Sequence, residues 1–195
     1  MINSFIFDFG GVITPIEPWD GWNPTDEERL IIRKIIPEIA KLFASELKEF
    51  KFTVSDFERE FKARAIGIKN ESAERIIRSL CTPNKELLSL ISKLSLKYKI
   101  YGLVNAPFGW TELRRGIHGL DRYFNQVFVS YEIGVRKPDP KIFNYLLENT
   151  GLVPNECLFV DDKEENVLAA KQLGMEGHVF KSTDDFKEYL SQKQF

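Results

Sequence analysis

The chain has 195 residues and a net charge of −2, and 43% of its residues are hydrophobic. This length allows a core domain with a smaller insertion, and this composition excludes an intrinsically disordered protein. The near-neutral charge gives no basic face that would indicate nucleic acid as the main partner.

Four short, nearly continuous apolar runs predict strands that are buried on both faces of a parallel sheet. Helical patterns separate the later runs, which is typical of βαβ units. We therefore predict an α/β fold with a doubly wound parallel sheet, in which the first strand is central. The predicted strands are residues 4–9, 99–104, 126–130 and 157–161, with a weaker fifth at 177–180.

Single residues predict several helix ends. Thr82 followed by Pro83 predicts the N-cap and the first position of one helix. Asp139 followed by Pro140 predicts the same arrangement for a later helix. Ser182 is expected to cap the last helix of the chain.

The segment between the first two strands has a different pattern, without a convincing strand. Thr25 and Ser55 each begin a capping-box pattern, and Pro37 is expected to kink or split the helix between them. We predict that residues 15–84 form an inserted, all-helical cap domain. Residues 1–14 and 85–195 would then form the α/β core domain.

Polar residues follow the predicted strands where ligands bind in open α/β sheets, beyond the carboxyl ends of the strands. Asp8 ends the first strand, Asn105 follows the second, and Asp161 and Asp162 end the fourth. Lys137 lies in a loop before a helix. Taken singly, such residues are often turn formers or helix caps. Their order along the chain predicts a shared site.

Carboxylates gathered at one sheet edge repel each other, and a hard divalent cation such as Mg²⁺ relieves that repulsion. A neighbouring Lys137 can hold phosphate oxygens as a point charge. Asp8 is then a candidate nucleophile that forms an aspartyl phosphate. The residues thus favour metal-assisted phosphoryl chemistry on a small phosphorylated substrate.

Three segments resemble motifs of the haloacid dehalogenase-like (HAD) hydrolase superfamily, in the subfamily with a helical type 1 cap. FDFGGVIT (7–14) is similar to its first motif, SYEIGVRKPDPKIF (130–143) to its third, and LFVDDKEENVLAAKQLGM (158–175) to its fourth. The resemblance spans the chain, because the motifs occur in order and the insertion follows the first.

The resemblance implies a Rossmann-like core and a Mg²⁺-dependent phosphohydrolase. By that resemblance Asp8 is the nucleophile, Lys137 neutralises the phosphate, and Asn105 contacts the transferring phosphoryl group. Asn166 takes the position that braces the acidic loop. The implied metal ligands are Asp8, the backbone carbonyl of Gly10, and Asp162, with Asp161 acting directly or through water.

Two positions differ from the usual pattern of the family's phosphatases. Gly10 stands where they carry a second Asp as general acid and base, and Val104 stands where they carry Ser or Thr. These differences leave open a catalytically weak or inactive protein that binds a phosphorylated ligand or a partner. A 2-haloacid dehalogenase is a third alternative, but those enzymes work without metal and lack the adjacent acidic pair.

The expected location is the cytoplasm. Neither Cys81 nor Cys157 has a metal-binding spacing, which fits a reducing compartment. The N-terminus lacks a signal-peptide pattern, and no apolar run is long enough to cross a membrane. We therefore expect no membrane partner, whereas the substrate and the oligomeric state cannot be predicted.

Overall fold

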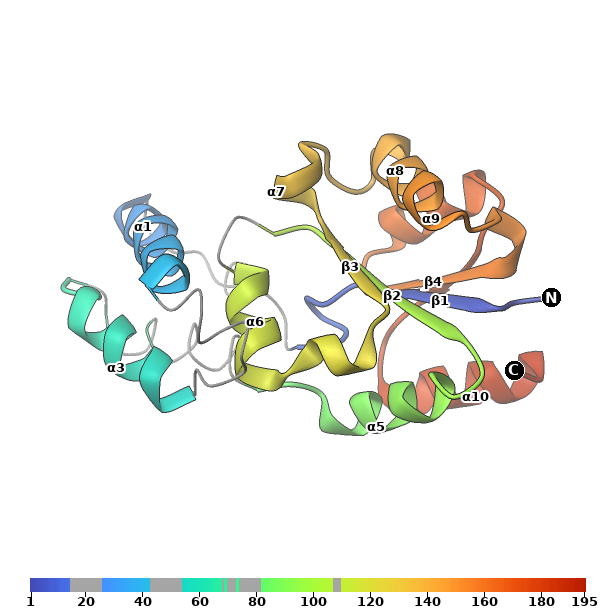
Figure 1. Ribbon diagram of the computed structural model, residues 1–195, viewed down its shortest axis with the longest axis horizontal. Coiled ribbons are helices and arrows are strands. Elements are labelled where there is room, and N and C mark those ends of the chain that lie inside the picture. Colours follow the sequence, from blue (N-terminus) through green and yellow to red (C-terminus); the bar gives the residue numbers. More distant parts are fainter. Residues whose placement is uncertain (15–25, 43–53, 68, 70–72, 74–81, 107–109) are drawn as a thin grey trace. The chain divides into compact units, whose positions relative to one another are not determined.

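The computed structural model describes residues 1–14, 26–42, 54–67, 69, 73, 82–106 and 110–195 (Figure 1). These residues form two compact units. The first contains Met1–Ile13, Asn84–Asn105 and Asp121–Phe195. The second contains the described residues of Thr14–Pro83 and Ala106–Leu120, so residues 106–120 join a unit other than the core to which the sequence assigned them. The assignment of residues 15–84 to a cap domain stays a prediction.

The first unit is built on a five-stranded parallel sheet with the strand order β3-β2-β1-β4-β5. β1 is central, as predicted, because β2 pairs with one of its edges and β4 with the other. The strands are β1 (Ser4–Phe7), β2 (Lys99–Val104), β3 (Gln126–Val129), β4 (Cys157–Asp161) and β5 (Glu176–Val179).

Helices cover both faces of this sheet (Figure 1), which confirms the doubly wound α/β fold. α8 (Pro140–Thr150) and α9 (Glu164–Gln172) pack on one face, where Phe143 and Val167 join Phe159 of β4 in the buried core. α5 (Lys85–Leu94) and α10 (Thr183–Lys193) lie on the other face. Short helical turns complete the unit: α7 (Ser130–Ile133), η1 (Leu120–Tyr123) and η2 (Pro154–Glu156).

Side-chain caps confirm two of the predicted helix starts. The Asp139 side chain accepts a hydrogen bond at the start of α8, and the Ser182 side chain does so at the start of α10. The prediction for Thr82 is wrong, because Asn84 is the N-cap of α5 and its Oδ1 accepts from the backbone of Leu87 at 3.0 Å. Asn84 is also held by Thr183, whose Oγ1 accepts from Asn84 Nδ2 at 3.1 Å.

The second unit contains three helices among its described residues: α1 (Asp26–Leu42), α3 (Val54–Arg64) and α6 (Trp110–His118). α1 contacts both α3 and α6. α1 also runs through Pro37, so this proline does not split the helix; Ile35, Ile36 and Ile39 are buried around it, and their burial offsets the lost hydrogen bond.

α3 begins at Val54, which places Ser55 inside its first turn rather than before it. Thr25 lies outside the described residues. None of the described helices is long and apolar enough to cross a membrane.

Candidate active site

Asp8 and Asp161 come to one edge of the sheet because β1 and β4 are parallel neighbours. Phe7 pairs with Val160, so the residue after each lies at the carboxyl end of its strand. The backbone N–H of Asp8 donates to the carbonyl of Val160 at 2.9 Å and extends this pairing by one residue. The strand pairing therefore fixes the spacing of the two carboxylates.

Lys137 is buried between these two carboxylates. Its Nζ lies 2.9 Å from Asp8 Oδ1 and 2.6 Å from Asp161 Oδ2, and it donates to the carbonyl of Leu103 at 2.7 Å. The lysine side chain is 0% exposed. A buried ammonium group needs such partners, because its transfer out of water costs on the order of several kcal/mol.

Asn105 holds the backbone of Lys137 rather than its charged end. Asn105 Nδ2 donates to the carbonyl of Lys137 at 2.9 Å, and the N–H of Lys137 donates to Asn105 Oδ1 at 2.8 Å. This pair of hydrogen bonds joins the loop before α8 to the end of β2. The second hydrogen of the Asn105 amide is left for another acceptor.

Asp161 is the most constrained carboxylate of the site. Its Oδ2 accepts from Lys137, while its Oδ1 accepts from the backbone N–H of Lys163 and from Asn166 Nδ2, both at 2.9 Å. Asn166 thus braces the acidic loop, as the family resemblance implied. Both oxygens of Asp161 are engaged by protein donors.

Asp162 supplies a third carboxylate. One oxygen from each of Asp8, Asp161 and Asp162 lies within 4.8 Å of the others, and no other such group of three metal-ligating side chains occurs among the described residues. The position of Asp162 depends on Gly11, which has a φ of +75°. A Cβ at Gly11 would clash with the Asp162 side chain, so both the backbone conformation and the available space favour glycine there.

The electrostatics of this cluster favour a proton or a cation. Burial raises the pKa of Asp8 to about 7, and the neighbouring Asp161 also raises it, although Lys137 acts in the opposite direction. Burial lowers the pKa of Lys137, but the two carboxylates outweigh that effect and raise it. Three carboxylates beside one lysine leave an excess of negative charge that a divalent cation would neutralise.

The structure thus brings together five of the residues that the sequence singled out: Asp8, Asn105, Lys137, Asp161 and Asp162. The catalytic and metal-binding roles assigned to these residues and to the Gly10 carbonyl stay predictions. Val104 is buried and offers no hydroxyl to the site. Sequence reasoning missed the carbonyl of Leu103 and the steric role of Gly11, although the paired glycines after Asp8 were a signal for the latter.

Comparison with known proteins shows the family of this chain. Residues 2–174 match the haloacid dehalogenase-like hydrolase family, and the chain belongs to that family. It is 26% identical to the D-ribitol-5-phosphate phosphatase of Bacteroides thetaiotaomicron, over 98% of each chain. It is 27% identical to the sesquiterpene phosphatase astK of Aspergillus oryzae, over 88% of this chain and 86% of that one.

Solved structures share the fold. A HAD family enzyme from Bacteroides thetaiotaomicron, crystallised with magnesium and inorganic phosphate, superimposes with a TM-score of 0.60 and 22% identity. That match covers 97% of this chain and 99% of the other. A hydrolase from Streptococcus pneumoniae gives a TM-score of 0.60 at 17% identity, over 97% and 98% of the two chains.

Proposed function

We propose that this hydrolase is a Mg²⁺-dependent phosphohydrolase that acts on a small phosphorylated metabolite through an aspartyl phosphate on Asp8. The observation that carries the proposal is the placement of the buried Lys137 ammonium between Asp8 and Asp161, beside the carboxylate of Asp162. Two of the relatives described above are named as phosphatases, which supports the same class of reaction.

The donor set fits Mg²⁺, which prefers oxygen ligands and carboxylates in particular. Asp8 and Asp162 are the ligands that we favour, together with the carbonyl of Gly10. Asp161 would act through a water molecule, because protein donors already engage both of its oxygens. Gly11 leaves the space that the carboxylate of Asp162 occupies. When bound, the ion would neutralise negative charge on the phosphoryl oxygens and on Asp8.

Asp8 would attack the phosphorus atom as the bond from phosphorus to the leaving oxygen breaks. Lys137 holds Asp8 in place and offsets the negative charge of Asp8 and of the phosphoryl group. Positioning and charge neutralisation of this kind supply most of the catalysis of phosphoryl transfer. The free hydrogen of the Asn105 amide can donate to a phosphoryl oxygen. Water would then attack the phosphorus of the aspartyl phosphate, which releases inorganic phosphate and restores the Asp8 carboxylate.

Gly10 has no side chain, so position 10 offers no group that could protonate the leaving oxygen. General acid catalysis contributes about 10²–10⁴-fold where it is present. A leaving group that is stable as an anion needs little of that help. The site therefore favours phosphate esters with acidic leaving groups, unless the cap supplies a donor.

Two alternatives remain. A weak or inactive protein that only binds a phosphorylated ligand is favoured by Gly10 and by the buried Val104, which together remove two polar groups from the site. A 2-haloacid dehalogenase is disfavoured by the adjacent Asp161 and Asp162, whose mutual repulsion calls for a cation. A cytoplasmic location and the absence of a nucleic-acid partner stay predictions from composition.

A phosphate-release screen over a panel of phosphorylated metabolites, with and without Mg²⁺, tests the proposal. We expect release that requires Mg²⁺ and that is lost in Asp8→Asn. Ligand binding without turnover of any panel member would favour the inactive alternative. Release of halide from 2-haloacids without metal would favour the dehalogenase.

A further inference from the structure

A cavity lies at the end of the sheet where the strands begin, opposite the end that carries Asp8 and Asp161. It has a volume of about 570 Å³, within the range of small-molecule sites. Its wall includes Asn3, Lys99, Asn125 and Glu156, which lie at or just before the first residues of β1, β2, β3 and β4 respectively. The length of β2 separates this edge from Asn105 by about 17–20 Å.

The wall of this cavity carries an excess of positive charge. Three of the side chains that line it are cationic, namely Lys97, Lys99 and Arg122. Glu156 is the one carboxylate in the lining. Glu156 Oε2 accepts from Asn3 Nδ2 at 2.6 Å. One carboxylate offsets one of the three cationic charges, so the wall keeps a net positive charge.

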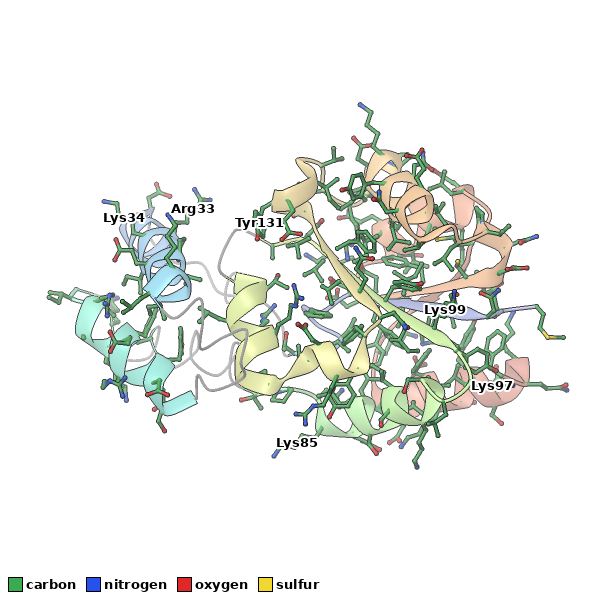
Figure 2. All side chains as sticks on the ribbon, viewed as in Figure 1. Arg33, Lys34, Lys85, Lys97, Lys99 and Tyr131 are labelled. Carbon is green, nitrogen blue, oxygen red and sulfur yellow. The ribbon has the colours of Figure 1, made fainter. Side chains whose placement is uncertain are left out.

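Lys97 and Lys99 have no carboxylate partner within the part of the chain that the structure describes. Lys97 Nζ instead lies 4.8 Å from the centre of the Tyr98 ring. Figure 2 shows both lysines at the end of the first unit where β2 begins, near the two chain termini. Two ammonium groups without counter-charges in one cavity create a field that attracts anions.

Several neutral polar groups of the wall already have partners within the protein. Asn125 Oδ1 accepts from the N–H of Ile100 at 2.7 Å, and the Thr150 hydroxyl donates to the carbonyl of Leu146 at 2.7 Å. The charged groups that can face a ligand are the lysines, and aromatic and aliphatic surface lies beside them. That combination suits a ligand with several negative charges and a carbon skeleton.

We propose that this cavity is a second binding site, which takes a small organic polyanion. Lys97 and Lys99 bind its anionic groups, while Tyr98 and Leu152 contact its carbon skeleton. Phosphate esters and polycarboxylates share the chemistry that these cations recognise. The site lies apart from Asp8 and does not depend on the proposed reaction.

Titration calorimetry in buffer freed of metal on a chelating resin, with no soluble chelator, tests this site without the metal-dependent contribution of the active site. The probes are ADP, inorganic pyrophosphate and citrate, each raised to a few millimolar at low ionic strength. We expect binding of at least one probe, weakened at least about tenfold in the double variant Lys97→Gln/Lys99→Gln. ADP that binds more tightly than pyrophosphate would assign the aromatic surface a role, and citrate alone would identify a polycarboxylate as the ligand.

The matched control is Lys34→Gln/Lys85→Gln, which removes the same charge from exposed lysines outside the cavity wall. This control and Asp8→Asn should bind the probes as the wild type does. The proposal is overturned if no probe binds, if the two double variants lose affinity equally, or if Asp8→Asn abolishes the binding. It is also overturned if the cavity variant loses only stability, which would mean that the lysines merely complement the carboxyl ends of nearby helices.

Discussion

Lys137 Nζ lies 2.6 Å from Asp161 Oδ2, and both side chains are completely buried. Asp161 has no exposed oxygen to offer, because Lys163 and Asn166 engage its other oxygen. The relationship makes Asp161 a positioning residue for Lys137, which in turn faces the nucleophile candidate Asp8.

The first prediction concerns this pair. Asp161→Ala should lower the free energy of unfolding by about 3–5 kcal/mol, because it leaves a buried ammonium group with one carboxylate fewer. Urea unfolding measures the loss. Asp161→Asn should cost less and still weaken turnover, since it keeps the shape but not the charge. If Asp161→Ala has the same free energy of unfolding as the wild type, the structural role assigned to Asp161 is wrong.

The second prediction concerns Asp8 and pH. Its pKa is raised from 3.8 to about 7, with burial as the main cause. The folded protein therefore holds a proton between these pH values that the unfolded chain has lost, so Asp8 lowers the stability as the pH rises through this window. Without metal at pH 8, Asp8→Asn should melt on the order of 5 °C higher than the wild type.

Differential scanning calorimetry in EDTA checks this result. The difference between Asp8→Asn and the wild type should shrink toward pH 4, where Asp8 is protonated in the folded protein. Saturating Mg²⁺ should narrow the difference at pH 8 by stabilising the wild type. If Asp8→Asn melts below the wild type at pH 8 without metal, the ionised Asp8 carboxylate does not destabilise the folded protein.

The third prediction concerns Gly11. Gly11→Ala places a Cβ against the carboxylate of Asp162 and strains a backbone with a φ of +75°. We expect Mg²⁺ affinity to fall at least about tenfold, since displacement of supporting groups at metal sites costs 10–100-fold. Calorimetric titration with Mg²⁺ gives this affinity directly. Gly134→Ala is the control, because its φ is +79° but no atom lies within 4 Å of the added Cβ.

If Gly134→Ala weakens Mg²⁺ binding as strongly as Gly11→Ala does, backbone strain rather than contact with Asp162 is the cause. Melting temperatures of the two variants show whether the strain is similar. A Gly11→Ala protein with unchanged Mg²⁺ affinity would mean that Asp162 is not a ligand.

The fourth prediction concerns Gly10. The enzyme should prefer aryl phosphates over alkyl phosphates, because a nitrophenolate leaves without protonation and an alkoxide does not. Gly10→Asp should narrow this gap by raising the rate on the alkyl substrate, provided that the metal site is undisturbed. Steady-state rates on matched aryl and alkyl substrates decide the question. Rapid hydrolysis of a sugar phosphate by the wild type, with no gain in Gly10→Asp, would mean that another residue supplies the acid.

Much of the core could be predicted because its signals are local. The apolar runs predict the strands to within two residues of their observed ends, and Asp139 and Ser182 cap the predicted helices. Asn84 illustrates the limit, since Thr82 is an equally good cap by composition. The choice depends on a distant contact, in which the N–H of Asn84 donates to the carbonyl of Ile13 at 2.7 Å.

The site shows the same division between local and distant causes. Asp8, Asp161 and Asp162 could be placed together because parallel strands end at one edge. The hydrogen bonds between Asn105 and Lys137 could not be predicted, because they join residues 32 positions apart through the geometry of a loop. No local pattern specifies such a contact, and the same holds for the clash that excludes a side chain at Gly11.

The covalent intermediate tests the central claim most directly. Enzyme quenched in acid during turnover of an aryl phosphate, with Mg²⁺ present, can be digested and its peptides mapped by mass spectrometry. The account predicts phosphate on Asp8, formed only with Mg²⁺ and absent when Asp8→Asn is tested in the same way. Turnover that leaves no phosphate on Asp8 at any quench time, or that places it on another residue, would contradict the account.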